Sequence, residues 1–210
     1  MKKELSILFM AAFTLASCEK EADTDKLDNK FVVYTNYDKS ANFASFNTYY
    51  LPDSILIIGD KKEAEYWNDE NAQKIISTYA ANMNSRGYTR IDNREEADLG
   101  LQVSYVKSTY FVTNYGQPEW WWGYPGYWDV PYWGNWGDWY YPYAVTYSYS
   151  TGSFVTELLN LDAPQGQTAQ LPILWTAYMS GLLSGSTSVN VDLSIQAVNQ
   201  AFTQSAYLKK

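Results

Sequence analysis

The chain has no histidine and a single cysteine, Cys18, among its 210 residues. Because imidazole is absent and we expect the one cysteine to be lipidated, thiolate and imidazole catalysis and Ser–His or Cys–His arrangements are excluded. Basic residues are also scarce: the formal net charge is −8, and lysine and arginine form no cluster, which argues against a nucleic-acid partner. Only carboxylates, hydroxyls and lysines remain for catalysis, and the sequence indicates no cofactor.

Residues 1–17 have the order of a secretory signal peptide. Lys2 and Lys3 form a positive start, an apolar run follows from Leu5 to Ala16, and small residues precede the cysteine. The apolar run has about a dozen residues, whereas a helix needs about 20 to span a bilayer. We therefore expect this segment to be removed from the mature protein.

Leu15-Ala16-Ser17-Cys18 resembles a bacterial lipobox, in which the cysteine is lipidated and becomes the mature N-terminus. The alternative is a chance cysteine within a plain signal peptide. Two or three acyl chains on Cys18 would hold the protein stably on a membrane, since one chain binds only marginally. We predict a lipoprotein of the outer membrane that is anchored to membrane lipid and faces the periplasm or the cell surface.

Residues 18–29 predict an acidic tether between the lipid and the folded part of the chain. The stretch EKEADTDKLDN has no apolar periodicity and alternates in charge. Its acidic residues resemble the surface-export signals of Bacteroidota lipoproteins, and a plain spacer explains them equally well. The remaining residues, 30–210, have the length of a single domain.

Two helices are predicted from apolar residues that recur every three or four positions. The first covers residues 68–86, with Asn68 or Asp69 as its N-cap. The second lies near the C-terminus, with Asn190 or Asp192 as its N-cap. The apolar faces consist of Ala72, Ile75, Ile76, Tyr79, Ala80 and Met83 in the first helix and of Ile195, Val198, Ala201 and Phe202 in the second.

Alternation every second residue predicts strands in the rest of the domain. Turn residues at 150–153 are expected to join two of these strands into a hairpin. The pattern favours an α+β domain with a mostly antiparallel sheet of five to six strands and two helices packed on one face. The predicted strands cover residues 31–34, 48–51, 99–112, 143–149, 154–161 and 173–179.

Four stretches resemble, in order and spacing, the bacterial lipoprotein family called domain of unknown function 4136. They are YTNYDKSANFASFNTYYLPD (34–53), SRGY (85–88), EADLGLQVSY (96–105) and ILWTAYMSG (173–181). Family members combine an aromatic first hairpin, a helix ending in Gly-aromatic, an Ala-Asp-Leu strand, an insert rich in Gly, Trp and Tyr, a Leu-Trp strand and a last helix. This chain departs at Asn42, where the family often has aspartate. The resemblance covers nearly the whole mature domain and implies an envelope lipoprotein, without an activity or catalytic residues to transfer.

The segment from 115 to 143 concentrates the aromatic residues. Seven of the nine tryptophans lie in EWWWGYPGYWDVPYWGNWGDWYYPY (119–143). Its many glycines and prolines predict a long loop rather than a helix or a central strand. Long loops in compact domains are usually functional or disordered, and disorder fits an aromatic composition poorly. The candidate contact residues are Trp120, Trp121, Trp122, Tyr124, Trp128, Asp129, Trp133, Trp136, Asp138 and Trp139.

Four interpretations of this aromatic segment remain open. It is a lid folded over a sheet face, a docking surface for an envelope protein, a glycan-binding face or a belt at the membrane interface. Exposed apolar patches on monomers seldom exceed about 300–600 Å², so we expect part of the segment to pack on itself or on the sheet.

A catalytic interpretation rests on Glu119, Asp129 and Asp138, because paired carboxylates carry out glycoside hydrolysis. All three lie on a loop whose spacing fixes no distance between them. No EF-hand-like spacing supports a calcium site either. The sequence therefore predicts a non-catalytic binding or structural module whose partner is an envelope protein or a glycan, with a carboxylate-based glycoside hydrolase as the weaker alternative.

Overall fold

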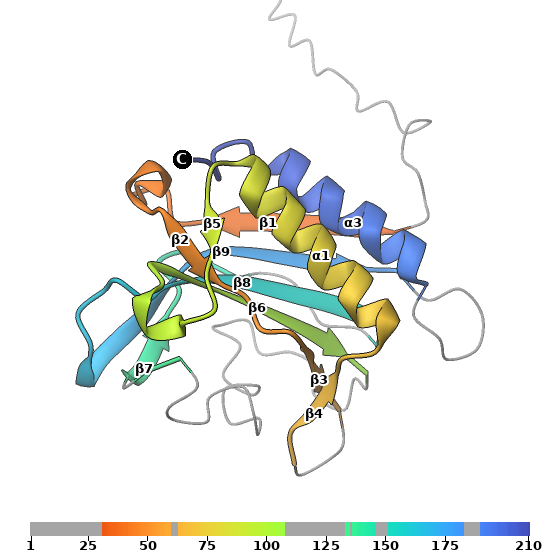
Figure 1. The fold of residues 1–210 in the computed structure, drawn as a ribbon, viewed down its shortest axis with the longest axis horizontal. Helices are drawn as coiled ribbons and strands as arrows, with labels where there is room; N and C mark the ends of the chain where they lie inside the picture. Colours follow the sequence, from red (N-terminus) through yellow and green to blue (C-terminus); the bar gives the residue numbers. More distant parts are fainter. Residues whose placement is uncertain (1–30, 60–62, 108–132, 135, 146–150, 183–189) are drawn as a thin grey trace, which may run out of the picture.

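The computed structural model describes residues 31–59, 63–107, 133–134, 136–145, 151–182 and 190–210. These residues form an α+β fold in which one large mixed sheet carries two helices on a single face (Figure 1). The predicted fold class and the placement of both helices are confirmed. Within the described ranges, no helix is long and apolar enough to cross a membrane.

Nine strands and two α-helices follow one another in the described parts of the chain. Two short 3-10 turns, Phe43–Ser45 and Arg94–Glu96, lie between them. The helices are α1 (Glu70–Ser85) and α3 (Val191–Gln204). The strands are β1 (Val32–Tyr37), β2 (Thr48–Tyr50), β3 (Ile55–Ile58), β4 (Glu65–Trp67), β5 (Thr89–Arg90), β6 (Leu99–Val106), β7 (Trp136–Tyr140), β8 (Ser153–Asn160) and β9 (Gly166–Ser180).

Six strands form the continuous path β1-β9-β8-β6-β2-β5. The pairs β1–β9, β9–β8 and β8–β6 are antiparallel, whereas β6–β2 and β2–β5 are parallel. β3 joins β6 in parallel and carries β4 as an antiparallel partner, and β7 joins β9 in parallel. The sheet is therefore larger and more mixed than the five to six mostly antiparallel strands that the sequence predicts.

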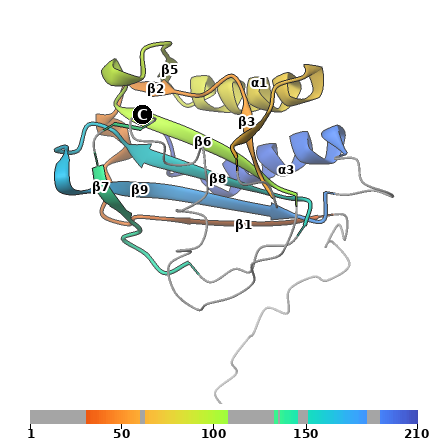
Figure 2. The same ribbon diagram turned by 90° about the horizontal axis from the view of Figure 1, so that it is seen from below.

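Both helices begin at residues that the sequence predicts as caps. The Asp69 side chain accepts hydrogen bonds from the backbone N–H groups of Asn71 and Ala72, and the Asn190 side chain accepts one from Leu193. Caps of this kind satisfy donors that the first helical turn leaves open, and each stabilises its helix by about 1 kcal/mol. The two helices lie side by side over the same face of the sheet (Figure 2).

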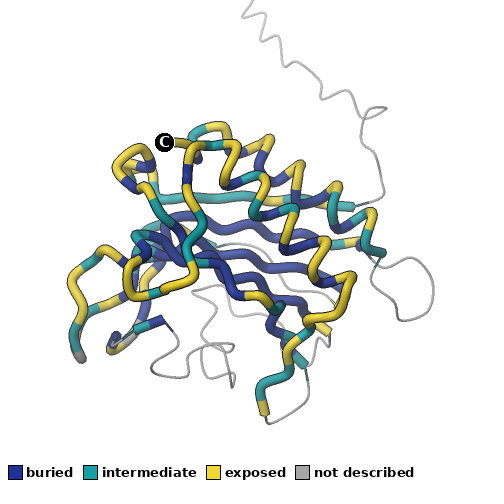
Figure 3. Tube along the Cα trace, viewed as in Figure 1, coloured by how far each residue is buried: buried dark blue, intermediate teal, exposed yellow. Residues whose placement is uncertain are grey.

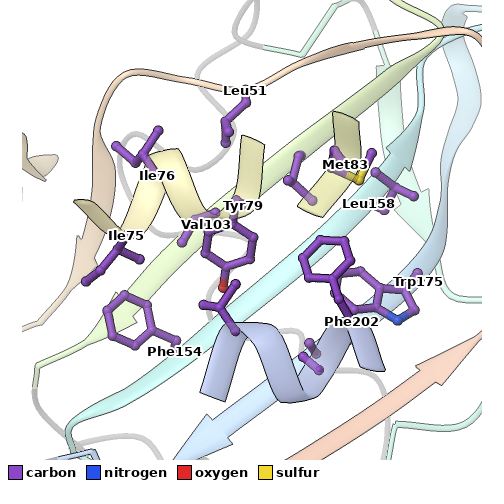
Figure 4. Close-up of a cluster of buried hydrophobic side chains, with 14 of the residues drawn as sticks. Leu51, Ile75, Ile76, Tyr79, Met83, Val103, Phe154, Leu158, Trp175 and Phe202 are labelled. Carbon is purple, nitrogen blue, oxygen red and sulfur yellow. The ribbon is translucent and has the colours of Figure 1, made fainter. Parts of the chain in front are cut away.

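The main core lies between the helices and the sheet (Figure 4). Trp175 of β9, Tyr79 of α1 and Phe202 of α3 are fully buried there. The hydroxyl groups of Tyr79 and Thr156 share a hydrogen bond, and Trp175 Nε1 donates to Ser205 Oγ at 2.8 Å. The polar ends of these large rings are therefore paired, so their burial stabilises the fold without stranding a donor.

Strands β6 and β8 are buried on both faces of the sheet (Figure 3). Side chains alternate along a strand. Leu101 and Leu158 accordingly pack in the core below the helices, while Gln102 and Glu157 point to the opposite side and are buried as well. The side of the sheet away from the helices is therefore a second buried layer.

Two predictions about strands are wrong. Residues 143–145 are not a strand, so they form no hairpin with residues 154–161, and β8 instead lies between β6 and β9. The predicted loop contains a strand, β7. Tyr143 and Val145 both pack against a buried cluster on the sheet, so apolar residues alternate here without strand pairing. Residues 146–149 of the predicted hairpin lie outside the described residues.

Candidate functional site

The described part of the aromatic segment, residues 133–134 and 136–143, packs against the sheet on the side away from the helices. It is called the second half of the segment below. Trp133, Trp136, Trp139 and Tyr141 are buried, with exposed fractions of 2%, 8%, 7% and 3%. We call these four residues, together with the apolar side chains that surround them, the tryptophan cluster. The surrounding side chains are Ala97, Leu159, Leu161, Leu171 and Ile173.

Strand β7 fixes the direction in which the rings of this cluster point. It pairs in parallel with the first half of β9, and Trp139 lies opposite Leu171. Alternation along β7 turns Trp139 into the cluster and leaves Tyr140 44% exposed. At the start of the strand, Trp136 Nε1 donates to the Trp133 carbonyl at 2.9 Å. The strand thus holds the second half of the aromatic segment in one orientation.

Residues 141–145, which we call the strap, follow β7 and cross three strands of the sheet. A strap group bonds to a side chain on each strand in turn. The bonds are Tyr141 Oη to Glu157 Oε1 on β8, Tyr143 Oη with Thr176 Oγ1 on β9, and Asn36 Nδ2 of β1 to the Ala144 carbonyl at 2.9 Å.

The sheet side chains below the strap stand in one row. Gln102 lies directly opposite Glu157, Glu157 opposite Thr176, and Thr176 opposite Asn36. All four therefore point to the same face of four neighbouring strands. Polar groups on a buried sheet face cost free energy unless they are hydrogen-bonded, and the strap supplies partners for three of them.

Glu157 is the unusual member of this row. Its side chain is fully buried, and burial raises the pKa of the carboxyl well above its usual value. Oε1 accepts the bond from Tyr141, whereas Oε2 has no hydrogen-bond partner. The Oε1 atom of Gln102 also lacks one, because its amide donates to the Val103 carbonyl and to Ser104 Oγ, at 3.1 and 3.3 Å.

The structure brings together three of the predicted contact residues, Trp133, Trp136 and Trp139, and buries their rings. The backbone of Asp138 lies in β7, opposite Gln170. The roles of the other predicted residues stay predictions, since these residues lie outside the described part of the chain: Cys18, Glu119, Trp120, Trp121, Trp122, Tyr124, Trp128 and Asp129.

Glu157 is the residue of this surface that the sequence analysis missed. A glutamate within an apolar strand usually points to solvent on an amphipathic sheet. The one signal in the sequence is the pair of residues two positions away, Val155 and Leu159, which are apolar and indicate that this face of the strand is buried too.

The chemistry of the described surface is that of aromatic rings and hydroxyl groups. In the parts of the chain that the structure describes, no three Cys, His, Asp or Glu side chains lie together as metal ligands. Of the three carboxylates considered for glycoside hydrolysis, only the backbone position of Asp138 is described. The described part of this surface therefore consists of aromatic rings packed on the sheet.

Comparison with known proteins places the fold in a family. The model of the family described as domain of unknown function (DUF4136) matches residues 33–205. The crystal structure of a DUF4136 family protein from Bacteroides thetaiotaomicron is 58% identical, with a TM-score of 0.79, and the match covers 87% of this chain and 99% of that one. A PelC dodecamer structure from Paraburkholderia phytofirmans is 12% identical, with a TM-score of 0.40 and coverage of 86% and 98%. No curated protein matches the chain. The chain belongs to the DUF4136 family.

Proposed function

We propose that this chain is a lipid-anchored lipoprotein of the bacterial cell envelope that acts as a non-catalytic binding or structural module. The first half of the aromatic segment, from Trp120 to Asp129, is the contact surface in this proposal. The observation that carries it is the fastening of the second half, where Trp133, Trp136 and Trp139 are buried against the sheet.

The lipid anchor is inferred from the leader. Lys2 and Lys3, the apolar run up to Ala16 and the small residues before Cys18 have the order that lipoprotein processing requires. Acylation of Cys18 by two or more chains gives stable attachment, since each buried CH₂ group contributes about 0.8 kcal/mol. The tether at 18–29 would then hold the domain close to the membrane surface.

A contact surface binds a partner more favourably when the chain next to it is already ordered. Each buried indole ring contributes several kcal/mol of stability through the apolar area that it removes from water. The strap adds hydrogen bonds to three strands. Because this part of the segment is already ordered, a partner that binds the neighbouring residues loses less binding free energy to ordering the chain.

The amino-acid composition of the first half of the aromatic segment indicates which class of partner it would bind. Tryptophan and tyrosine are the residues that most often anchor protein interfaces, so an envelope protein is the first candidate. A glycan is the second, because flat rings stack on sugar faces while Asp129 and Asn135 supply oxygen and nitrogen atoms for hydroxyl groups.

The buried carboxyl gives no support to catalysis. Burial raises the pKa of the Glu157 carboxyl, and perturbed pKa values are common in active sites. Its side chain is fully buried, however, and one oxygen is occupied by the Tyr141 hydroxyl. A substrate has no access to such a group, so we assign Glu157 a role within the fold.

Replacing Cys18 with Ser tests the anchor. The full-length gene is expressed in a bacterial host, and detergent-phase partitioning and incorporation of a fatty-acid label are measured. We expect the parent chain and a Ser17→Ala control to be labelled and to enter the detergent phase, and the Cys18→Ser variant to lose both properties. A Cys18→Ser variant that still takes up label and partitions like the parent would defeat the proposal.

A further inference from the structure

We propose that Glu157 is held as a neutral carboxylic acid whose O–H group donates a hydrogen bond to Gln102 Oε1. In this state Glu157 acts as a latch for the strap, so that ionisation of Glu157 releases the strap from the sheet. Glu157 lies outside the proposed contact surface, and its role as a latch is independent of the lipid anchor. The latch would control the second half of the aromatic segment.

Two unpaired oxygen atoms carry the first step. Glu157 Oε2 and Gln102 Oε1 are both buried and both lack a hydrogen-bond partner. The two residues lie directly opposite each other on β6 and β8, where the Cβ atoms of paired residues are about 4.5–5.5 Å apart. Two acceptors on such neighbours repel each other when Glu157 is ionised.

A single proton on Glu157 gives both unpaired oxygen atoms a hydrogen-bond partner. A neutral Glu157 carries an O–H donor on Oε2, and the facing Gln102 Oε1 accepts its hydrogen bond. The amide of Gln102 is already committed elsewhere, to the Val103 carbonyl and Ser104 Oγ, so it cannot supply that donor itself. Burial raises the pKa of the Glu157 carboxyl in the direction that this arrangement requires.

The strap is the element that the latch controls. Tyr141 bonds to the same carboxyl through its hydroxyl, and the next two strap bonds lie on β9 and β1. Burying a carboxylate is far more costly than burying the acid, so ionisation favours admission of water to Glu157. Water reaches this row when the strap lifts, and the neighbouring Trp139 and Trp133 rings then lose part of their cover.

The described neighbours of Glu157 bring no second carboxyl and no basic group to it. Among the described residues that face it from β6, from β9, from β8 itself and from the strap, none carries a charge near neutral pH. These neighbours are Gln102 and Ser104 of β6, Thr176 and Tyr178 of β9, Val155 and Leu159 of β8, and Tyr141 and Tyr143 of the strap.

Infrared difference spectroscopy tests the protonation state directly. The full-length chain and its Glu157→Gln variant are compared in detergent at about pH 6, where an ordinary glutamate with a pKa of about 4.3 is ionised. We expect the difference spectrum to contain the carbonyl band of a protonated carboxyl, and a Gln102→Leu variant to shift that band. A difference spectrum with only the bands of an ionised carboxylate would overturn the proposal. If added Na⁺, K⁺ or Ca²⁺ also stabilised the folded protein, a cation site at Glu157 would replace it. A band that Gln102→Leu leaves unmoved would overturn the assigned acceptor.

Tryptophan quenching by acrylamide, measured as the pH rises from about 5 to 9, tests strap release. The parent chain is expected to show a several-fold rise in quenching with one titration midpoint, and Glu157→Gln to show none. Glu95→Gln serves as the matched control, because the Glu95 side chain is 79% exposed. Far-UV circular dichroism checks that each variant is folded. If parent and Glu157→Gln give parallel quenching curves, the latch is wrong.

Discussion

Trp133 lies directly over Gly100 of β6, so close that a Cβ atom built on Gly100 would be 2.4 Å from the Cζ3 atom of the indole ring. Real Cβ contacts essentially never fall below about 3.0 Å. The ring therefore occupies the space that any side chain at position 100 would take. This contact ties the aromatic segment to the middle of the sheet.

Replacing Gly100 with Ala should displace Trp133 and destabilise the domain. Overpacking of a well-packed core typically costs about 1–3 kcal/mol, which lowers the melting temperature by several degrees in a domain of this size. Urea unfolding followed by tryptophan fluorescence measures the loss. Gly59→Ala is the control, because the nearest atom to its new Cβ would be Lys107 Cβ at 3.7 Å, an ordinary contact. Equal stability of Gly100→Ala and the parent would contradict the packing of Trp133.

Neighbouring positions of β7 should respond very differently to truncation. Trp139 is buried in the tryptophan cluster, and loss of a buried Trp side chain typically costs about 3–5 kcal/mol. Tyr140, one residue further along, is 44% exposed, so Tyr140→Ala should cost far less. The free energies of unfolding of the two variants, compared with the parent, measure the difference. A larger loss for Tyr140→Ala would mean that β7 faces the other way.

The first half of the aromatic segment should matter for contact and little for stability. We expect simultaneous replacement of Trp120, Trp121 and Trp122 by Ala to leave the melting temperature within a few degrees of the parent. In the proposed function these rings contact a partner and do not contribute to the core. Differential scanning calorimetry provides the measurement. A loss comparable with that of Trp139→Ala would show that these rings belong to the core, and the lid interpretation of the segment would replace the contact surface.

Glu157→Gln should stabilise the protein at neutral pH and have little effect in acid. Burial raises the pKa of Glu157 in the folded state, whereas the unfolded pKa is about 4.3. Below the unfolded value, both states are protonated and the neutral acid contributes its full stability. Between the two values only the unfolded state releases the proton, so the free energy of unfolding of the parent falls by up to about 1.4 kcal/mol per pH unit.

The variant lacks this slope, so its advantage over the parent should grow as the pH rises towards the folded pKa. Urea unfolding at a series of pH values measures both curves, with the exposed Glu95→Gln variant as a control. Parallel curves for parent and Glu157→Gln would show that the carboxyl ionises in the folded protein much as it does in the unfolded chain.

Local patterns predict the helices because their signals lie within one or two turns. The caps Asp69 and Asn190 stand next to the apolar faces that they initiate, and both helices begin at the residue after the cap. The period of the apolar residues also assigns the buried face correctly, as Tyr79 and Phe202 show. The fold class follows from these helices together with the strands.

The pairing of the strands and the row of polar side chains below the strap depend on residues far apart in the sequence. The sequence therefore predicts them poorly. Tyr143 has the alternation of a strand, yet its hydroxyl bonds across the sheet to Thr176, 33 residues away. A glutamate at position 157 is expected to face solvent, and its burial becomes clear only once Tyr141 of the strap is known to bond to it across β8. The aromatic segment was expected to pack in part, and its second half does, because β7 pairs with the extension of β9.

Photo-crosslinking in living cells tests the central claim most directly. A photoreactive phenylalanine is placed at Trp121 in the first half of the aromatic segment and, as the control, at Tyr66 of β4, which is 41% exposed. The account predicts a discrete adduct with an envelope protein or a glycan from position 121 and none from position 66. No adduct from position 121, or the same adducts from both positions, would contradict a dedicated contact surface.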